Sequence, residues 1–143
     1  IRIITDGACR GNPGPGGWAA LIIDGQQCKE LGGFVENTTN NRMELTAVIE
    51  ALKHVPAASP TLIISDSSYV IDGATKWMKG WRVRNWMTRD DKPVENRDLW
   101  ETLDSLLDGS ISWEQVRGHA GHPENERADE LAREGMAPFQ KRR

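Results

Sequence analysis

The sequence predicts an α/β domain with a mixed β-sheet and helices packed on both faces. Three strand-like segments open the chain, and helical and strand patterns alternate after them, which is the order expected for such a sheet. A length of 143 residues suits one ordinary domain with one hydrophobic core. Because no repeat, low-complexity tract or linker divides the chain, we expect a single domain over residues 1–143.

The opening of the chain predicts three strands. Residues 1–5 are rich in β-branched side chains and lead into a turn-rich, glycine- and proline-containing connection at 7–17. Residues 18–23 and 28–35 flank Asp24-Gly25, which predicts a hairpin because both turn positions favour positive φ. The Gly-Pro connection lacks the Gly-Lys-Ser/Thr ending of a P-loop, which argues against a nucleotide triphosphatase.

The rest of the chain alternates helices and strands. Thr38 or Thr39 can cap a helix in which four apolar residues follow the i, i+3, i+4, i+7 spacing: Leu45, Val48, Ile49 and Leu52. Residues 62–64 are continuously apolar, which predicts a short strand buried on both faces. The remaining patterns predict helices at 69–81, 99–107 and 124–136, with a strand at 111–116.

Three acidic residues stand where a purely structural role is costly. Asp6 directly follows the first strand, Asp66 ends the most apolar strand, and Glu44 lies beside the buried stripe of its helix. A carboxylate in such a place costs several kcal/mol to desolvate unless a cation or a hydrogen-bond donor accompanies it. Acids converging on the carboxyl ends of strands predict a Mg²⁺ site. Each acid alone could instead be a cap or turn residue, and Asp66 could cap the helix that follows it.

Charge is distributed unevenly along the chain. The formal net charge of −3 argues against a protein that holds nucleic acid through its overall charge. Residues 76–92, here called the basic segment, nevertheless carry six bases and two acids, a local charge of +4. The basic segment also contains Trp77, Trp81 and Trp86, and we expect these rings to form its core rather than a base-stacking platform. The other three tryptophans are predicted to lie in the core: Trp18, Trp100 and Trp113.

Composition also bears on the protein's setting. No run approaches the 18 apolar residues typical of a transmembrane helix, so we expect no membrane partner. Two cysteines, Cys9 and Cys28, are too few for a disulfide scaffold and favour free thiols in a reducing cytoplasm.

Four blocks of the sequence resemble one known family, type 1 ribonuclease H. The chain carries them in the order that the family shows, and together they cover essentially its whole length. They read TDGAC with GNPGPGG at residues 5–17, TTNNRMEL at 38–45, DSSYV at 66–70 and GHAGHPENERADELA at 118–132.

The resemblance implies a five-stranded mixed sheet whose second strand is antiparallel, and an endonuclease that hydrolyses the RNA strand of RNA–DNA hybrids. Two Mg²⁺ ions, or alternatively Mn²⁺, would be bound with the substrate by Asp6, Glu44, Asp66 and Asp129. The products would carry 5′-phosphate and 3′-hydroxyl ends.

The resemblance also gives roles to the last block. It implies that His119, in a glycine-flanked loop, takes a proton from the attacking water or helps product leave. His122 is interpreted as structural, and Glu126 either holds an outer water or has no role in the site.

The same resemblance implies a set of substrate contacts in a monomeric protein. Asn12, Asn40 and Asn41 are similar to amides that contact the hybrid, and Thr39 to part of a phosphate-binding site, although Asn40 and Asn41 also suit a helix N-terminal turn. The basic segment resembles a protruding element that holds the hybrid, with candidate contacts at Trp77, Lys79, Trp81, Arg82 and Arg84.

Two features depart from the family pattern. Ser68 stands where many bacterial members carry glutamine, and the net charge is negative rather than basic. We therefore expect weaker or more salt-sensitive substrate binding with the chemistry retained.

Other functions remain open at this stage. A non-catalytic binding module could keep the fold and lose the reaction, and a reverse transcriptase domain or an integrase could share the fold. The four carboxylates, His119 and the intact basic segment favour an active, stand-alone enzyme.

Overall fold

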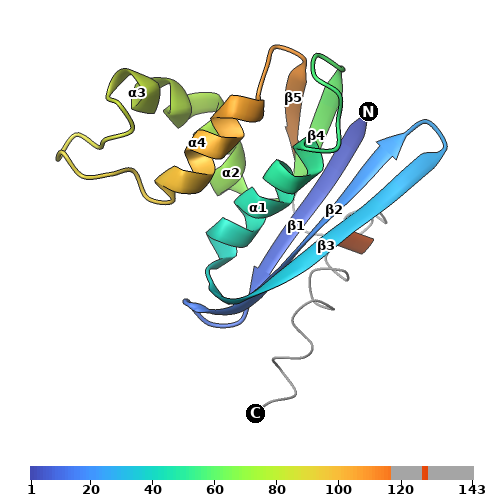
Figure 1. The fold of residues 1–143 in the computed structure, drawn as a ribbon, viewed down its shortest axis with the longest axis horizontal. Coiled ribbons are helices and arrows are strands. Elements are labelled where there is room, and N and C mark those ends of the chain that lie inside the picture. The colour runs from blue at the N-terminus through green and yellow to red at the C-terminus, as the bar shows by residue number, and fades with distance from the viewer. Residues whose placement is uncertain (117–126, 129–143) are drawn as a thin grey trace.

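The computed structural model describes residues 1–116 and 127–128, and these residues form a five-stranded sheet in the order β3-β2-β1-β4-β5 (Figure 1). The strands are β1 (Arg2–Cys9), β2 (Gly14–Asp24), β3 (Gln27–Thr38), β4 (Thr61–Ser65) and β5 (Ile111–Gln115). β2 pairs antiparallel with both β1 and β3, whereas β4 pairs parallel with β1 and with β5. The mixed sheet with an antiparallel second strand is therefore confirmed.

The first two strands are longer than the sequence predicted. Residues 7–17 were predicted to be a connection, but Gly7, Ala8 and Cys9 continue β1 and pair with residues 16–18 of β2. Only residues 10–13 connect the two strands. Gly16 shows the reason, because a Cβ there would come within 2.6 Å of Thr38 Cγ2. The glycine permits close packing inside the sheet, where the sequence indicated a turn.

The helices cover one face of this sheet. They are α1 (Asn40–Leu52), α2 (Ser68–Asp72), the π-helical turn η1 (Gly73–Trp77), α3 (Met78–Val83) and α4 (Arg97–Leu106). Thr39 caps α1 as expected, its hydroxyl accepting a hydrogen bond from the Arg42 N–H at 3.2 Å. The four apolar residues predicted to form a stripe along α1 are all buried in the main core, together with Ile3, Ile63 and Trp100.

A second core lies on the opposite face of the sheet. Because side chains alternate along a strand, Ile4 and Ile64 point away from α1 and pack with Leu21 and Ala128. Arg127 and Ala128 are helical, and Arg127 pairs with Glu30 of β3 at 2.7 Å. Helical residues thus contact both faces, as predicted. The remainder of the helix predicted at 124–136 lies outside the described residues.

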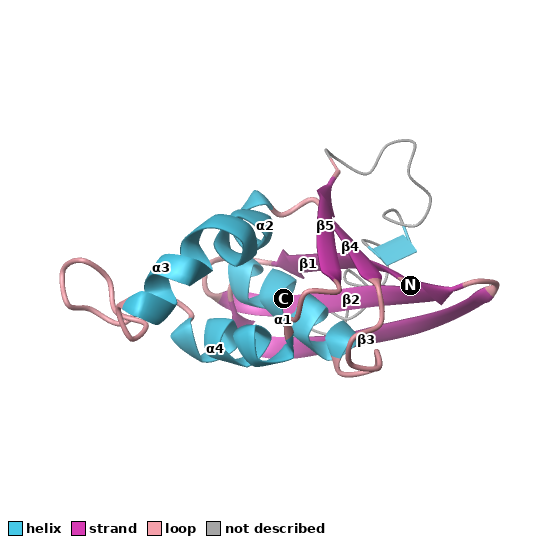
Figure 2. Ribbon diagram, turned by 90° about the horizontal axis from the view of Figure 1, so that it is seen from above, coloured by secondary structure: helices cyan, strands magenta, loops and turns pink. Residues whose placement is uncertain are grey.

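The helix predicted at 69–81 is present as α2, η1 and α3, which follow one another without a break. The π-helical turn begins at Gly73, where a Cβ would lie 2.0 Å from Cη2 of the fully buried Trp100. The wider turn accompanies the packing of a helix backbone directly on an indole ring. α3 and the loop after it project from the molecule away from the β2–β3 hairpin (Figure 2).

The tryptophans of the basic segment contact one another, and Trp81 and Trp86 pack against the main core as predicted, whereas Trp77 is 41% exposed. The Trp81 ring lies 5.2 Å from Trp100, 6.0 Å from Trp77 and 6.3 Å from Trp86, measured between centroids. Trp100 is fully buried, but Trp18 and Trp113 are only half-buried, so their placement in the core was predicted only in part. Among the described residues, no helix is long and apolar enough to cross a membrane.

Replacing Gly73 by alanine tests the contact between η1 and Trp100. We expect Gly73→Ala to lower the free energy of unfolding by about 1–3 kcal/mol, because the added methyl group overpacks a filled site. Gly109→Ala is the matched control, since a Cβ at Gly109 meets nothing within 4 Å. Urea unfolding of both variants measures the difference, and equal stabilities would contradict the packing described here.

Candidate active site and metal centre

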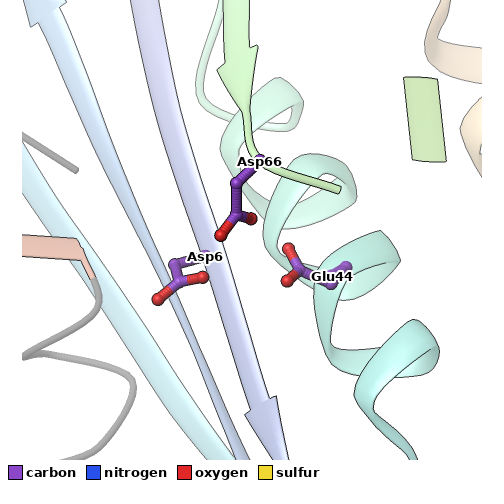
Figure 3. Close-up of side chains that lie close together, drawn as sticks. All are labelled: Asp6, Glu44 and Asp66. Carbon is purple, nitrogen blue, oxygen red and sulfur yellow. The ribbon is translucent and has the colours of Figure 1, made fainter. Parts of the chain in front are cut away.

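Three carboxylates from distant parts of the sequence meet at one edge of the sheet. Asp6 comes from β1, Glu44 from α1, and Asp66 from the residue directly after β4 (Figure 3). One oxygen of each carboxylate lies within 4.8 Å of an oxygen of the other two. Asp6 and Glu44 are buried and Asp66 is half-buried. The predicted convergence of these residues, here called the acid cluster, is confirmed.

Strand register explains why Asp6 and Asp66 meet. β1 and β4 are parallel neighbours, and Ile4 is the register partner of Ile64. Asp6 and Asp66 each follow that last pair by two residues, so both side chains lie on the same side where the pairing of β1 with β4 ends. This is the edge at which parallel α/β sheets bind their ligands. Asp66 comes directly after β4, whereas Asp6 lies inside β1, not after it as the sequence had suggested.

Gly7 brings the third carboxylate into the cluster. A Cβ at Gly7 would lie 2.5 Å from the Glu44 nitrogen and 2.7 Å from the Met43 carbonyl carbon. The backbone of α1 therefore rests directly on the backbone of β1, and a larger residue leaves no room for this contact. The Gly7 N–H donates a hydrogen bond to the Glu44 carboxylate, which fixes that side chain beside Asp6.

Asp66 does not cap the next helix, so that alternative is wrong. The residue before α2 is Ser67, whose hydroxyl accepts a hydrogen bond from the Val70 N–H at 3.2 Å. The Ser67 N–H in turn donates to the Ser65 hydroxyl at 3.1 Å. The two serines complete the turn, and the Asp66 carboxylate points into the acid cluster (Figure 3).

Burial and two neighbouring carboxylates perturb the ionisation of Glu44. Burial raises the pKa of its carboxyl well above the ordinary value, and the neighbouring Asp6 and Asp66 raise it further. The hydrogen bond from Gly7 opposes this shift of the pKa without cancelling it. Glu44 Oε2 is buried and has no hydrogen-bond partner among the described residues. A buried carboxylate oxygen next to two further carboxylates fits a hard divalent cation, which prefers oxygen ligands.

The predicted substrate contacts near α1 also come together. Asn12, Thr39, Asn40 and Asn41 line a hollow of about 320 Å³, here called the amide hollow, and Glu95 completes its lining. Asn40 and Asn41 begin α1, so they do form the helix N-terminal turn that the sequence suggested. Sequence reasoning missed Glu95, because no local pattern connects the loop before α4 with the start of α1.

The candidate contacts in the basic segment separate into two groups. Trp81 is packed among aromatic rings, and Arg82 pairs with Asp104 of α4, its Nε donating to Oδ1 at 2.8 Å. Lys79, Arg82 and Arg84 are exposed, and Trp77 is 41% exposed. These four residues are accessible to a ligand, although Arg82 is also paired with Asp104, whereas Trp81 packs against the core.

Several predicted site residues lie outside the described part of the chain. These are the fourth carboxylate and the candidate proton-transfer residue, together with two residues given secondary roles: Asp129, His119, His122 and Glu126.

The sheet order and the acid cluster at its edge define an α/β protein with a carboxylate metal centre. A family model described as RNase H matches residues 1–137. A ribonuclease H of Rhizobium meliloti (strain 1021) is 53% identical over 144 residues, which cover 100% of this chain and 94% of that protein. A ribonuclease H of Thiobacillus denitrificans is 56% identical over 137 residues, covering 95% of this chain and 93% of that protein.

Solved structures agree with the sequence comparison. LC9-RNase H1, described as a type 1 RNase H with the type 2 active-site motif, superposes with a TM-score of 0.78 at 32% identity, over 97% of this chain and 72% of that one. LC11-RNase H1 in complex with an RNA/DNA hybrid shares the fold, with a TM-score of 0.73 at 23% identity over 97% and 98%. The chain belongs to the ribonuclease H family, type 1.

Glu44 predicts an unusual pH dependence of stability without metal. Because its pKa is raised in the folded protein, the folded state keeps a proton that the unfolded chain releases above about pH 4.5. Stability contributed by this group therefore falls as pH rises from 4.5 toward the folded pKa. We expect Glu44→Gln to remove that loss, so that urea unfolding in a chelator shows the variant gaining on the wild type with rising pH. Added Mg²⁺ should stabilise the wild type more than the variant.

Asp98→Asn is a control of opposite sign. The Arg42 guanidinium lowers the pKa of Asp98, so its contribution is present above about pH 3.8 and is lost as pH falls. This variant should leave the decline of stability toward neutral pH in place. Parallel pH profiles for the wild type and Glu44→Gln would contradict the buried acid cluster.

Gly7→Ala tests whether close packing of α1 on β1 positions the metal ligands. We expect the variant to unfold at lower urea concentration and to bind Mg²⁺ more weakly, because the helix must move away from Asp6 by a fraction of an ångström or more. Gly32→Ala is the matched control in β3, where a Cβ would make an ordinary contact at 3.5 Å. The two are compared by urea unfolding and by calorimetric titration with Mg²⁺; equal Mg²⁺ affinities would show that Gly7 has no positioning role.

Proposed function

We propose that this chain is an endonuclease that hydrolyses the RNA strand of RNA–DNA hybrids with divalent metal ions. The observation that carries the proposal is the acid cluster, in which oxygens of Asp6, Glu44 and Asp66 approach within 4.8 Å of one another. Family membership gives the substrate class, since the matched relatives are ribonucleases H and LC11-RNase H1 was solved with an RNA/DNA hybrid.

The acid cluster accounts for the need for metal. Asp6 is the residue we assign to both ions, with Glu44 and Asp66 completing one set of ligands and Asp129 the other. Carboxylate ligands favour Mg²⁺, with Mn²⁺ as the alternative. When bound, the ions would supply charge that activates a water and stabilises the departing 3′ oxygen. Hydrolysis would form a bond from the water oxygen to phosphorus and break the bond from phosphorus to the 3′ oxygen, which gives 5′-phosphate and 3′-hydroxyl ends.

His119 is the residue we assign to proton handling. An imidazole titrates near neutral pH, so it can take a proton from the attacking water or give one to the departing product. In the sequence, His119 stands between Gly118 and Gly121, in the same block as Asp129.

The amide hollow suits the sugar–phosphate backbone of the substrate. Backbone N–H groups at the start of a helix, here the cap Thr39 and the first residues of α1, attract phosphate. The amides of Asn12, Asn40 and Asn41 can donate to phosphate or sugar oxygens, and short polar side chains can read 2′-hydroxyls in the wide minor groove of a hybrid. Glu44 lies about one helical turn beyond Asn40 and Asn41, so a strand held here passes close to the acid cluster.

The basic segment supplies the positive charge that the amide hollow lacks. Lys79 and Arg84 are exposed near Trp77, and a polyanion gains affinity from each base that neutralises a phosphate. We assign these residues to backbone contacts outside the cleavage site. Trp81 and Arg82 would contribute by holding this surface in place. The protein is proposed to act as a single-domain monomer in the cytoplasm.

Cleavage of an end-labelled RNA–DNA hybrid tests the function directly. We expect cutting only in Mg²⁺ or Mn²⁺, with double-stranded DNA, double-stranded RNA and single-stranded RNA left intact. Asp66→Asn should lower turnover roughly a hundredfold or more, because it removes a metal-binding carboxylate.

Asp24→Asn is the matched control, because it makes the same substitution at an exposed residue. Asp24 lies at the hairpin end of β2, away from the acid cluster. If the wild type binds the hybrid but cuts it in neither metal, the protein is a binding module and not an enzyme. Equal turnover of Asp66→Asn and Asp24→Asn would remove Asp66 from the reaction.

A further inference from the structure

The amide hollow carries an unexpected charge. Among the described residues that line it, four have uncharged side chains and Glu95 is the one acidic residue: the others are Asn12, Thr39, Asn40 and Asn41. Glu95 is exposed, in the loop directly before Asn96, the cap of α4. Among the described residues, no side chain forms an ion pair with Glu95 within 4.0 Å.

The nearest cation of α1 does not offset this carboxylate. Arg42, one residue after Asn41, donates from its two terminal nitrogens to Asp98 at 3.0 and 2.7 Å. It also donates to the side-chain oxygen of Asn96 at 3.2 Å. The guanidinium is therefore used to attach the start of α4 to α1, and its charge is balanced by Asp98. Arg42 is thus engaged with Asp98 and Asn96, and it forms no ion pair with Glu95 within 4.0 Å.

A phosphate placed in the amide hollow would meet two opposing effects. Amides, a hydroxyl and the start of a helix attract it, while the Glu95 carboxylate repels it. Like charges brought together at a binding surface lower affinity and change which partners bind. Since the repulsion acts on the bound strand in the ground state and in the transition state alike, it changes the binding of substrate and not the chemical step.

We propose that Glu95 is a repulsive affinity determinant in the amide hollow, one that weakens the binding of the nucleic-acid backbone and so sets the KM for hybrid cleavage. This inference rests on the proposed function, because it requires that the hollow hold a phosphate of the substrate. Under this proposal, a residue outside the acid cluster controls substrate affinity. Part of the weaker substrate binding expected from the negative net charge would then come from the Glu95 side chain.

Neutralising Glu95 tests the proposal. We expect Glu95→Gln to lower KM about three- to tenfold at low salt with kcat unchanged, and Glu95→Lys to lower it further because attraction replaces repulsion. Both effects should shrink toward none as salt rises to about 0.5 M, where screening acts over a few ångströms. The lysine variant should also steepen the dependence of log Kd on log salt by about one unit.

Two controls make the result specific to the site. Asp24→Asn changes the net charge by the same amount but lies far along β2 from the hollow. Asp24 is the last residue of β2, whereas Gly14, the first, pairs with Thr38 beside the hollow. The KM of Asp24→Asn should equal that of the wild type. Binding of uncut hybrid by Asp66→Asn and by Asp66→Asn/Glu95→Gln, followed by fluorescence anisotropy, gives the affinity change without turnover.

The possible outcomes separate the two proposals. A wild-type protein that does not cut the hybrid fails the proposed function itself. A protein that cuts normally, with KM equal in Glu95→Gln and Asp24→Asn, overturns the role of Glu95 alone. A rise of KM in Glu95→Gln also overturns it, because Glu95 would then hold the substrate through a hydrogen bond or a shared cation. A lower KM confined to the Glu95 variants supports the repulsion.

Discussion

The contact between α1 and β1 at Gly7 is the constraint on which the rest of the site depends. It brings a buried glutamate against two aspartates, although burial and mutual repulsion both oppose the charged form of Glu44. The backbone of α1 packs directly on Gly7, and the Glu44 side chain is buried, with the Gly7 N–H donating to its carboxylate. The fold therefore holds an electrostatically unfavourable group in place, and a divalent cation is the partner that relieves the strain.

The same helix connects the acid cluster to the aromatic part of the molecule. Arg42 fastens α1 to the start of α4, and Asn96 donates from its amide nitrogen to the Tyr69 hydroxyl at 3.1 Å. Trp100 donates to that hydroxyl as well, at 3.0 Å. One polar network thus joins α1, α2 and α4 beside the amide hollow. It holds the loop that carries Glu95 next to Asn40 and Asn41. Substrate contacts and metal ligands share a single rigid support.

The elements that were predicted correctly have local signals. The stripe of α1, the hairpin near Gly25 and the position of Asp66 directly after β4 are visible in short stretches of sequence. Two details of these predictions were wrong: the turn is Gly25-Gln26, with Asp24 still paired with Gln27, and Asp6 lies inside β1 rather than after it. What was missed depends on contacts between distant residues. Gly16 suggested a turn, because the sequence does not reveal that it lies against Thr38. Gly73 suggested an ordinary helix, because the sequence does not reveal its contact with Trp100. Glu95 was missed for the same reason, since only the folded chain brings it beside the amide hollow.

Charge placement then explains how an acidic chain can act on a polyanion. Neutral amides and helix N–H groups can orient a phosphate, but they do not neutralise it and so release no counterions. The salt-dependent part of the affinity must therefore come mostly from exposed bases such as Lys79 and Arg84. These bases lie in the basic segment, apart from the acid cluster. A repulsive Glu95 in the amide hollow limits how tightly the strand is held near the start of α1. Affinity and catalysis are thereby assigned to different surfaces of one small fold, and each can change with little effect on the other.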